Sequence, residues 1–360
     1  MSLTTITASE ALSQLAWYSV VIDARSPTEF ELDRLPNAVN WPSLDNEERI
    51  RVGTIYKQVN AFEAKKIGGA LVARNIAKHI EAYALDKPKT WRPLIYCWRG
   101  GNRSGALALV LNKIGFDVHL IEGGYKAFRS AMVADLETLV TQFDYRVVCA
   151  PTGSGKTRLL QALTLQGTQI LDLEALANHR SSVLGLVPGT AQPSQKQYDM
   201  RIWQALKALD PARPVFVESE SKKVGNVSIP QCLIAAMRAS PCLRLDLPAN
   251  ARVALLLEDY DYFVRDPEFF CARLDVLIPL RGREVVQGWQ AQARAGLMAE
   301  VVQDLLTHHY DPSYLSSMER NFKQYGAAKV YAMTTHSHAA FAELARTVNI
   351  DESSSLSTKL

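Results

Sequence analysis

The chain has 360 residues, of which 48% are hydrophobic and 21% are charged, and its formal net charge is +3. This composition is typical of a soluble globular protein, and the length suits two domains. A net charge this close to zero excludes a field over the whole molecule as the means of holding nucleic acid, so local basic patches would have to do so.

The cysteines and the N-terminal segment indicate where the protein works. Five cysteines lie far apart without any CxxC spacing, which argues against a disulfide framework and against a thiolate zinc site. The first 26 residues have no basic start and no long apolar run, and no segment approaches about 18 uninterrupted apolar residues. We therefore expect a cytoplasmic protein that has no membrane partner.

The first 130 residues alternate short apolar runs with helical patterns. The apolar runs cover residues 20–22, 93–97 and 118–121, and the helical patterns cover residues 70–83 and 104–114. This alternation predicts a mostly parallel sheet covered by helices. We assign residues 1–130 to this α/β domain and residues 131–145 to a connecting helix.

Cys97 ends one of these runs and begins a glycine-bearing loop that leads into a helix. A cysteine there lies at the positive end of the helix dipole, in a ring of backbone N–H groups and beside Arg99 and Arg103, all of which favour the thiolate. We predict that Cys97, Arg99 and Arg103 are catalytic. The predicted oxyanion loop consists of Gly100, Gly101, Asn102 and Ser104.

A second alternation of strands and helices begins near residue 146. Its apolar runs cover residues 146–150, 169–172, 214–218 and 243–246, and amphipathic helical patterns follow at residues 285–295, 298–308 and 337–348. We assign residues 146–265 to a phosphate-binding α/β domain and residues 266–350 to a helical C-terminal region. Residues 351–360 are polar and serine-rich, which predicts a flexible tail.

The segment 150–157 lies between a predicted strand and a predicted helix, as a Walker A loop does. Ala150 replaces the first glycine of that pattern. Backbone N–H groups would cradle phosphate oxygens, Lys156 would neutralise them, and Thr157 would ligate Mg²⁺ if a metal is used. The predicted phosphate-binding residues are Thr152, Gly153, Ser154, Gly155, Lys156 and Thr157.

A carboxylate that contacts Mg²⁺ or its water shell should end a strand near this loop. Asp172 and Glu218 both end predicted strands, and the sequence does not choose between them. Either could equally be a helix N-cap or a solvated strand end.

The N-terminal motifs resemble those of the rhodanese family. Residues 23–30 (DARSPTEF) and 34–42 (RLPNAVNWP) precede the Cys97 loop in the order that the family uses, and Cys97 matches its sulfur-carrying cysteine. Ordinary single-domain rhodaneses have a six-residue loop, whereas Cys97 to Arg103 spans seven residues, the length found in Cdc25-type phosphatases. A larger ring suits a tetrahedral phosphate-like group better than a bare sulfur.

The two domains together resemble bacterial tRNA 2-selenouridine synthases over nearly the whole chain. The matching residues beyond the two loops are 172–174 with 177–180, 192–195, 217–223 and 310–314. Where that family usually has His-Arg-Gly-Ser, this chain has a serine at position 181.

The resemblance implies a selenotransferase and geranyltransferase that acts on tRNA carrying wobble 2-thiouridine. Selenium from selenophosphate would replace the 2-thio sulfur through a geranylated intermediate made from geranyl diphosphate. The phosphate loop would hold that diphosphate, and the Cys97 loop would hold selenophosphate, with selenophosphate synthetase as a potential delivering partner. No tightly bound cofactor is expected.

Such an enzyme must hold tRNA through its backbone phosphates and give access to the anticodon bases. The predicted tRNA-binding residues are Lys222, Lys223, Arg281, Arg283 and Arg320, beside the aromatic residues Tyr310, Tyr314 and Phe322. His179 is either a catalytic acid or base or a structural histidine.

Two other functions fit the motifs. One is a Cdc25-like phosphatase fused to a P-loop kinase, which predicts turnover of a phosphoester at Cys97 and nucleotide hydrolysis that needs Lys156. The other is a non-enzymatic sulfur-relay or tRNA-binding module, which predicts a persulfide on Cys97 and no change in the tRNA nucleosides.

Overall fold

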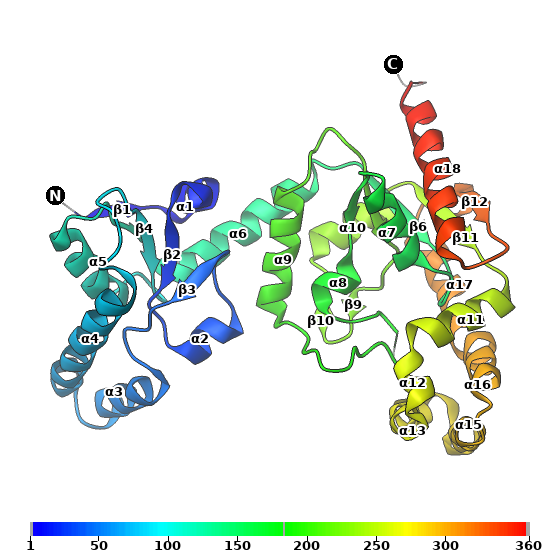
Figure 1. Ribbon diagram of the computed structural model, residues 1–360, viewed down its shortest axis with the longest axis horizontal. Coiled ribbons are helices and arrows are strands. Elements are labelled where there is room, and N and C mark those ends of the chain that lie inside the picture. The colour runs from blue at the N-terminus through cyan, green and yellow to red at the C-terminus, as the bar shows by residue number, and fades with distance from the viewer. Residues whose placement is uncertain (1–2, 183, 358–360) are drawn as a thin grey trace. The chain divides into compact units, whose positions relative to one another are not determined.

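A computed structural model describes residues 3–182 and 184–357 of the chain (Figure 1). It divides into two compact units: unit 1 comprises Met1–Thr138 and Ser194–Gln204, and unit 2 comprises Leu139–Pro193 and Ala205–Leu360. No helix among the described residues combines the length and the apolar character needed to cross a membrane.

Unit 1 is built on a five-stranded parallel sheet in the order β1-β5-β4-β2-β3. Its strands are β1 (Thr4–Ile6), β2 (Val20–Asp23), β3 (Ala38–Asn40), β4 (Pro93–Tyr96) and β5 (His119–Ile121). Its helices are α1 (Ala8–Gln14), η1 (Leu15–Trp17), α2 (Pro27–Leu32), α3 (Asn46–Gln58), α4 (Ala61–Tyr83), α5 (Asn102–Ile114), α6 (Gly124–Val140) and the first part of α9 (Gln195–Lys207).

The register of this sheet brings two sequence motifs to one edge. Asp23 at the end of β2 pairs with Tyr96 at the end of β4, so the segment after each strand begins at the same edge. The strands are anchored by a buried core in which Ile22 and Ile95 pack with Leu107 of α5. Cys97 therefore begins its loop from a fixed position.

Unit 2 contains a second five-stranded parallel sheet, in the order β12-β11-β6-β8-β7, and an antiparallel pair β9–β10. Its strands are β6 (Tyr145–Cys149), β7 (Gln169–Leu171), β8 (Val215–Glu218), β9 (Lys223–Val224), β10 (Val227–Ser228), β11 (Cys242–Asp246) and β12 (Lys329–Ala332). Its first helices are α7 (Lys156–Leu165), α8 (Leu173–Ala177), α10 (Gln231–Ala239) and α11 (Ala249–Asp259). The later ones are α12 (Asp261–Arg265), α13 (Pro267–Leu274), η2 (Asp275–Leu277), α14 (Ile278–Arg281), α15 (Arg283–Arg294), α16 (Met298–Leu305), η3 (Leu306–Tyr310), α17 (Asp311–Asn321), η4 (Tyr325–Ala327) and α18 (His338–Ser357).

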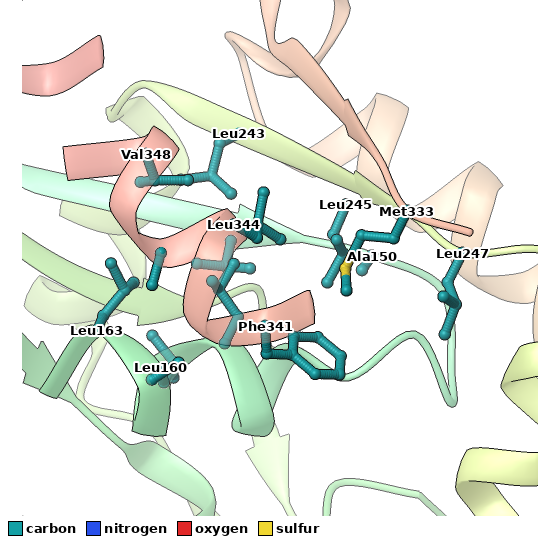
Figure 2. Packing of buried hydrophobic residues seen from close by; sticks show 14 of the residues in the cluster. Ala150, Leu160, Leu163, Leu243, Leu245, Leu247, Met333, Phe341, Leu344 and Val348 are labelled. Carbon is teal, nitrogen blue, oxygen red and sulfur yellow. The ribbon is translucent and has the colours of Figure 1, made fainter. Parts of the chain in front are cut away.

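The core of unit 2 holds its phosphate loop at the centre of the sheet. Strand β6 lies between β11 and β8, and the loop after β6 leads directly into α7. Leu160 of α7 packs with Leu245 of β11 and with Phe341 and Leu344 of α18 (Figure 2). The C-terminal helix thus covers the helix that follows the phosphate loop.

The predicted fold class, two α/β units with a helical C-terminal part, is confirmed. The C-terminal part differs in detail, because residues 266–350 also contain β12, which pairs with β11 at the sheet edge. Helix α18 continues to Ser357, so residues expected in a flexible tail are helical up to that point. Ser194–Gln204 belongs to unit 1 although it follows the phosphate loop by about 40 residues.

Candidate active sites

Cys97 is held at the start of its loop by contacts with the next helix. Its side chain is 3% exposed, and the hydroxyl of Ser104 donates to its Sγ at 3.1 Å. Asn102 and Ser104 lie in the first turn of α5, where backbone N–H groups have no acceptor within the helix. The predicted oxyanion loop therefore places backbone N–H groups and a hydroxyl beside the sulfur.

These contacts decide the ionisation of the thiol. Burial opposes the charged form, but the hydrogen bonds from Ser104 and the charge of Arg103 outweigh it, and the pKa of Cys97 falls below its usual value. A thiol with a lowered pKa is a better nucleophile at neutral pH because more of it is thiolate.

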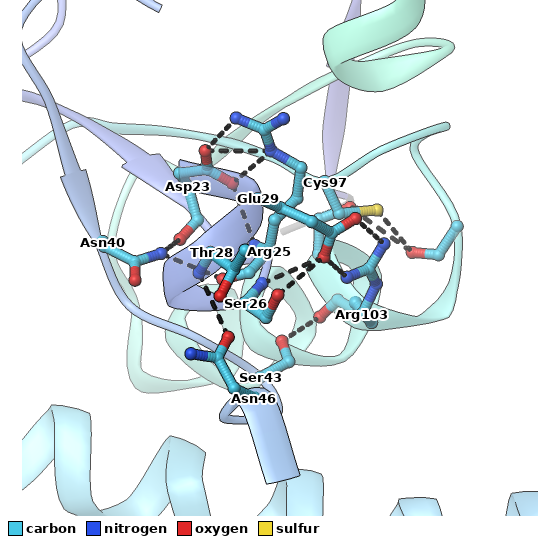
Figure 3. Close-up of polar contacts among 12 residues, drawn as sticks. Asp23, Arg25, Ser26, Thr28, Glu29, Asn40, Ser43, Asn46, Cys97 and Arg103 are labelled. Carbon is cyan, nitrogen blue, oxygen red and sulfur yellow. Dashed lines mark hydrogen bonds and ion pairs between the residues drawn. The ribbon is translucent and has the colours of Figure 1, made fainter. Parts of the chain in front are cut away.

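The two predicted arginines have different surroundings. Arg103 donates from Nη1 to Glu29 Oε2 at 2.7 Å and from Nη2 to Glu29 Oε1 at 3.4 Å, so its guanidinium is oriented by a carboxylate (Figure 3). Glu29 is itself placed by the capping box of α2, in which Ser26 is the N-cap. Arg99 is exposed and is available to an anion that enters from solvent.

The early motif of unit 1 supports the loop rather than lining it. The buried Arg25 donates to Asp23 at 2.6 Å, and Asn40 donates to the carbonyl oxygens of both residues. Tyr96 completes the cluster with a hydrogen bond to Asp23 at 2.7 Å. Because Tyr96 immediately precedes Cys97, this network fixes the backbone from which the Cys97 loop begins.

Two further features of this site were missed by sequence reasoning. The N–H of Tyr125, at the start of α6, donates to the carbonyl of Cys97 at 2.8 Å, and a Cβ at Gly124 would lie 2.3 Å from that same carbonyl. The consecutive glycines at 123 and 124 were the available signal. Lys196 of α9 places its Nζ 5.5 Å from the ring of Trp98, and no local pattern links it to the Cys97 loop.

The phosphate loop of unit 2 has the close packing that its glycines predict. Gly153 and Gly155 have φ angles of 78° and 83°, and a Cβ at either would collide with Leu256 or Phe341. Lys156 donates from Nζ to the carbonyl of Ala150 at 3.0 Å. The lysine side chain therefore folds back over the loop, where its positive charge would pair with a bound diphosphate.

Hydrogen bonds beside the loop distinguish the two carboxylates, Asp172 and Glu218, that were predicted to lie near a metal ion. Thr157 donates to Glu174 Oε2 at 3.3 Å, and Glu174 donates its backbone N–H to Glu218 Oε1 at 3.0 Å. Asp172 instead accepts from the backbone of Ala175 as the N-cap of α8. Hydrogen bonds therefore link Thr157 to Glu218 through Glu174, a residue that sequence reasoning missed, whereas Asp172 caps a helix.

Two buried glutamates carry raised pKa values. Burial, together with neighbouring carboxylates that include Asp172 and Glu174, raises the pKa of Glu218 well above its usual value, and its Oε2 has no partner. Burial and the charge of Glu174 raise the pKa of Glu220 to about 8, although Lys156 opposes this rise.

The oxygen atoms around Thr157 suit a hard cation. The hydroxyl of Thr157, the carboxylate of Glu174 and the unpartnered Oε2 of Glu218 are donors of the type that Mg²⁺ prefers. Within the described residues, no group of three or more His, Cys, Asp or Glu side chains forms a complete metal site. The site therefore fits a hydrated Mg²⁺ that takes further oxygen ligands from a phosphate substrate.

Thr157 and Glu174 line a cavity of about 790 Å³ in unit 2, whereas Glu218 is buried behind its wall. Lys156, Glu174 and Glu220 face it together with His179, whose Nδ1 is buried without a partner and whose pKa is lowered by burial. Its neutral imidazole suits either proton transfer or a structural role. The cavity is large enough for a diphosphate and a nucleobase at once.

The predicted motif 310–314 supports the phosphate loop. Arg252 donates to the carbonyl of Thr152 at 2.7 Å and forms a bidentate pair with Asp311. Tyr314 shares a hydrogen bond of 3.0 Å with Ser219. The motif thus ties α17 to the start of the loop and to the strand end of β8.

The predicted tRNA-binding residues differ in how far they are exposed to solvent. Lys222, Lys223, Arg283 and Arg320 are exposed on unit 2. Arg281 is half-buried and donates to His309 Nδ1 at 3.1 Å. Of the aromatic candidates, Phe322 is buried in the core and has no face for a base, whereas Tyr310 and Tyr314 line the cavity.

Comparisons with known proteins cover both units. Residues 143–273 match the family described as tRNA 2-selenouridine synthase AAA domain, and residues 7–131 match the rhodanese-like domain. A tRNA 2-selenouridine synthase of Marinobacter nauticus is 33% identical over 82% of this chain and 87% of its own length. One of Bdellovibrio bacteriovorus is 31% identical over 83% of this chain and 89% of its own length. One of Nitrosomonas europaea is 37% identical over 67% of this chain and 63% of its own length.

Proposed function

The chain belongs to the tRNA 2-selenouridine synthase family, and we propose that it replaces the 2-thio sulfur of wobble 2-thiouridine in tRNA with selenium. Selenophosphate is the selenium donor, and geranyl diphosphate first activates the sulfur by alkylation. One observation supports this function most directly: Ser104 donates to the Cys97 sulfur in one loop and Lys156 folds over its own loop in the other, so that each loop is suited to bind an anion.

Alkylation takes place at the phosphate loop. The 2-thio sulfur of the base attacks C1 of geranyl diphosphate, so that an S–C bond forms while the C–O bond to the diphosphate breaks. Lys156 and the N–H groups at the start of α7 hold the negative charge that develops on the leaving diphosphate. Mg²⁺, when bound near Thr157, would supply further neutralisation of that charge.

Alkylation also releases a proton from N3 of the base, because the 2-alkylthio ring carries no hydrogen there. Glu220 is suited to accept it, since its side chain is buried but lines the cavity that contains Lys156. Its pKa of about 8 lies close to neutral pH, where a general base works well.

Selenation takes place at Cys97 by chemistry of the phosphatase type. The thiolate attacks the phosphorus of selenophosphate, so that an S–P bond forms and the P–Se bond breaks with release of hydrogen selenide anion. Arg99, Arg103 and the first-turn N–H groups of α5 hold the phosphoryl oxygens. Water then hydrolyses the phosphocysteine to phosphate and restores the thiol, with no change of oxidation state.

The released hydrogen selenide anion completes the exchange. Selenium attacks C2 of the geranylated uridine, the C2–S bond breaks, and geranyl thiolate leaves while the selenide proton moves to N3. The alkyl group is needed because a thiolate leaves from C2 far more readily than the sulfide of an unmodified thiocarbonyl.

Nucleoside mass spectrometry tests this function. Purified protein is incubated with 2-thiouridine RNA, and geranyl diphosphate or selenophosphate is omitted in turn. We expect S-geranyl-2-thiouridine when selenophosphate is absent, 2-selenouridine when both are present, and unchanged RNA when geranyl diphosphate is absent. Phosphate release without any change of nucleoside would favour the phosphatase alternative instead.

A further inference from the structure

An apolar slot of about 60 Å³ lies beside the large cavity of unit 2. It is formed by helices α11, α12, α13 and α16, which are labelled in Figure 1, and by η3. Its described lining residues are Thr152, Ser182, Leu184, Leu256, Leu257, Tyr260, Phe263, Val264, Phe270, Met298, Val302, Leu305, Leu306 and Tyr310. None of these carries a charge.

The slot opens next to the phosphate loop. Thr152, Leu256, Tyr260 and Tyr310 line both the slot and the large cavity. Leu256 touches the loop closely, since a Cβ at Gly153 would lie 2.7 Å from its Cδ1. A ligand whose anionic head lies on the phosphate loop can therefore extend directly into the slot.

The lining determines which tail can enter. A nucleoside would bury its ring nitrogens and hydroxyls against leucine, valine, phenylalanine and methionine side chains, and an unpaired buried polar group is costly. A hydrocarbon tail would gain from the same burial, by about fourfold in affinity for each buried methylene group. The slot thus selects an amphiphilic diphosphate over a nucleotide.

We propose that this slot binds the distal isoprene unit of a prenyl diphosphate whose diphosphate group lies on the phosphate loop. One water molecule needs about 10–15 Å³ on the same scale, so the slot holds about four to six heavy atoms, the size of one five-carbon unit. The first isoprene unit, which carries the reacting C1, then stays in the large cavity beside Leu256 and Tyr260.

This geometry limits the length of the donor's prenyl chain. The inference rests on the proposed alkylation function. A five-carbon donor does not reach the slot, a ten-carbon donor fills it, and the third isoprene unit of a fifteen-carbon donor has no room. In this arrangement the helices that line the slot limit the length of the donor's hydrocarbon chain.

Position 302 offers a direct test, because Val302 lines the slot but is only half-buried, so that substitution there is compatible with folding. Val302→Trp fills the slot and Val302→Ala enlarges it. Val285→Trp is the matched control, since Val285 is exposed on α15 and does not line the slot. Affinities for inorganic diphosphate and for dimethylallyl, geranyl and farnesyl diphosphate are measured for each full-length protein, together with transfer to 2-thiouridine RNA.

For the wild type and Val285→Trp we expect geranyl diphosphate to bind on the order of 100-fold more tightly than inorganic diphosphate, given several buried carbons. Val302→Trp should lose at least about tenfold of that preference with diphosphate affinity unchanged, and Val302→Ala should gain use of farnesyl diphosphate. Equal geranyl affinity in Val302→Trp and the wild type would overturn the slot assignment even if transfer occurs. Tight geranyl binding without transfer would instead overturn the alkylation function and leave the slot assignment standing.

Discussion

Replacing Ser104 with alanine removes the hydroxyl that donates to the Cys97 sulfur at 3.1 Å. A hydrogen bond to a charged group contributes about 1.5–3 kcal/mol, and one pKa unit corresponds to about 1.4 kcal/mol. Since Ser104 lowers the pKa of Cys97, its loss should raise that pKa. A loss of that hydrogen-bond energy corresponds to a thiolate population about 10- to 100-fold smaller at a fixed pH below the pKa.

The pKa is obtained from the pH dependence of iodoacetamide alkylation at Cys97, quantified on its peptide by mass spectrometry. That readout separates Cys97 from the other four cysteines. Ser13→Ala is the matched control because Ser13 is exposed on α1 and its hydroxyl donates to the carbonyl of Glu10 in the same helix. A Ser104→Ala profile that coincides with that of the wild type would refute the view that this hydroxyl stabilises the thiolate.

Three further outcomes are expected. Asp311→Ala should weaken diphosphate binding by about tenfold, because Arg252 loses the carboxylate that holds it against the carbonyl of Thr152. Isothermal titration calorimetry measures the affinity, and an unchanged value would show that this contact does not support the phosphate loop. Asp261→Ala, which breaks an exposed helical pair, should change neither binding nor melting. Glu220→Gln should have the same melting temperature as the wild type near pH 4.5 but a higher one at pH 9. In the folded protein the Glu220 carboxyl has a pKa of about 8, against an ordinary value of 4.5. The stability of the wild type therefore falls as the pH rises between these two values, whereas glutamine stays neutral. Identical melting curves at both pH values would show that Glu220 is not a strained buried carboxyl.

The sequence could place both loops because each is a local feature. In unit 1 and in unit 2, a strand, a glycine-bearing turn and a helix follow one another within about 15 residues, and that order predicts where Cys97 and Lys156 lie. The predicted family is confirmed by relatives that align over most of the chain.

The rest of each site depends on contacts between distant residues. Arg103 faces Glu29 across 74 positions, and Arg252 meets Thr152 across 100. Periodicity within one element carries no information about such pairs. Glu220 and Lys196 likewise have no local signal, since a glutamate after a strand or a lysine on a helix is usually solvated.

We propose that two separate sites act in sequence, with Lys156 in alkylation and Cys97 in selenation. The most direct test is nucleoside mass spectrometry with each variant on each substrate, 2-thiouridine RNA and chemically S-geranylated RNA. Lys156→Ala should leave 2-thiouridine unchanged but convert geranylated RNA to 2-selenouridine, and Cys97→Ala should accumulate the geranylated nucleoside from 2-thiouridine RNA. If Lys156→Ala cannot selenate geranylated RNA, or if Cys97→Ala still forms 2-selenouridine, the two-site account is contradicted.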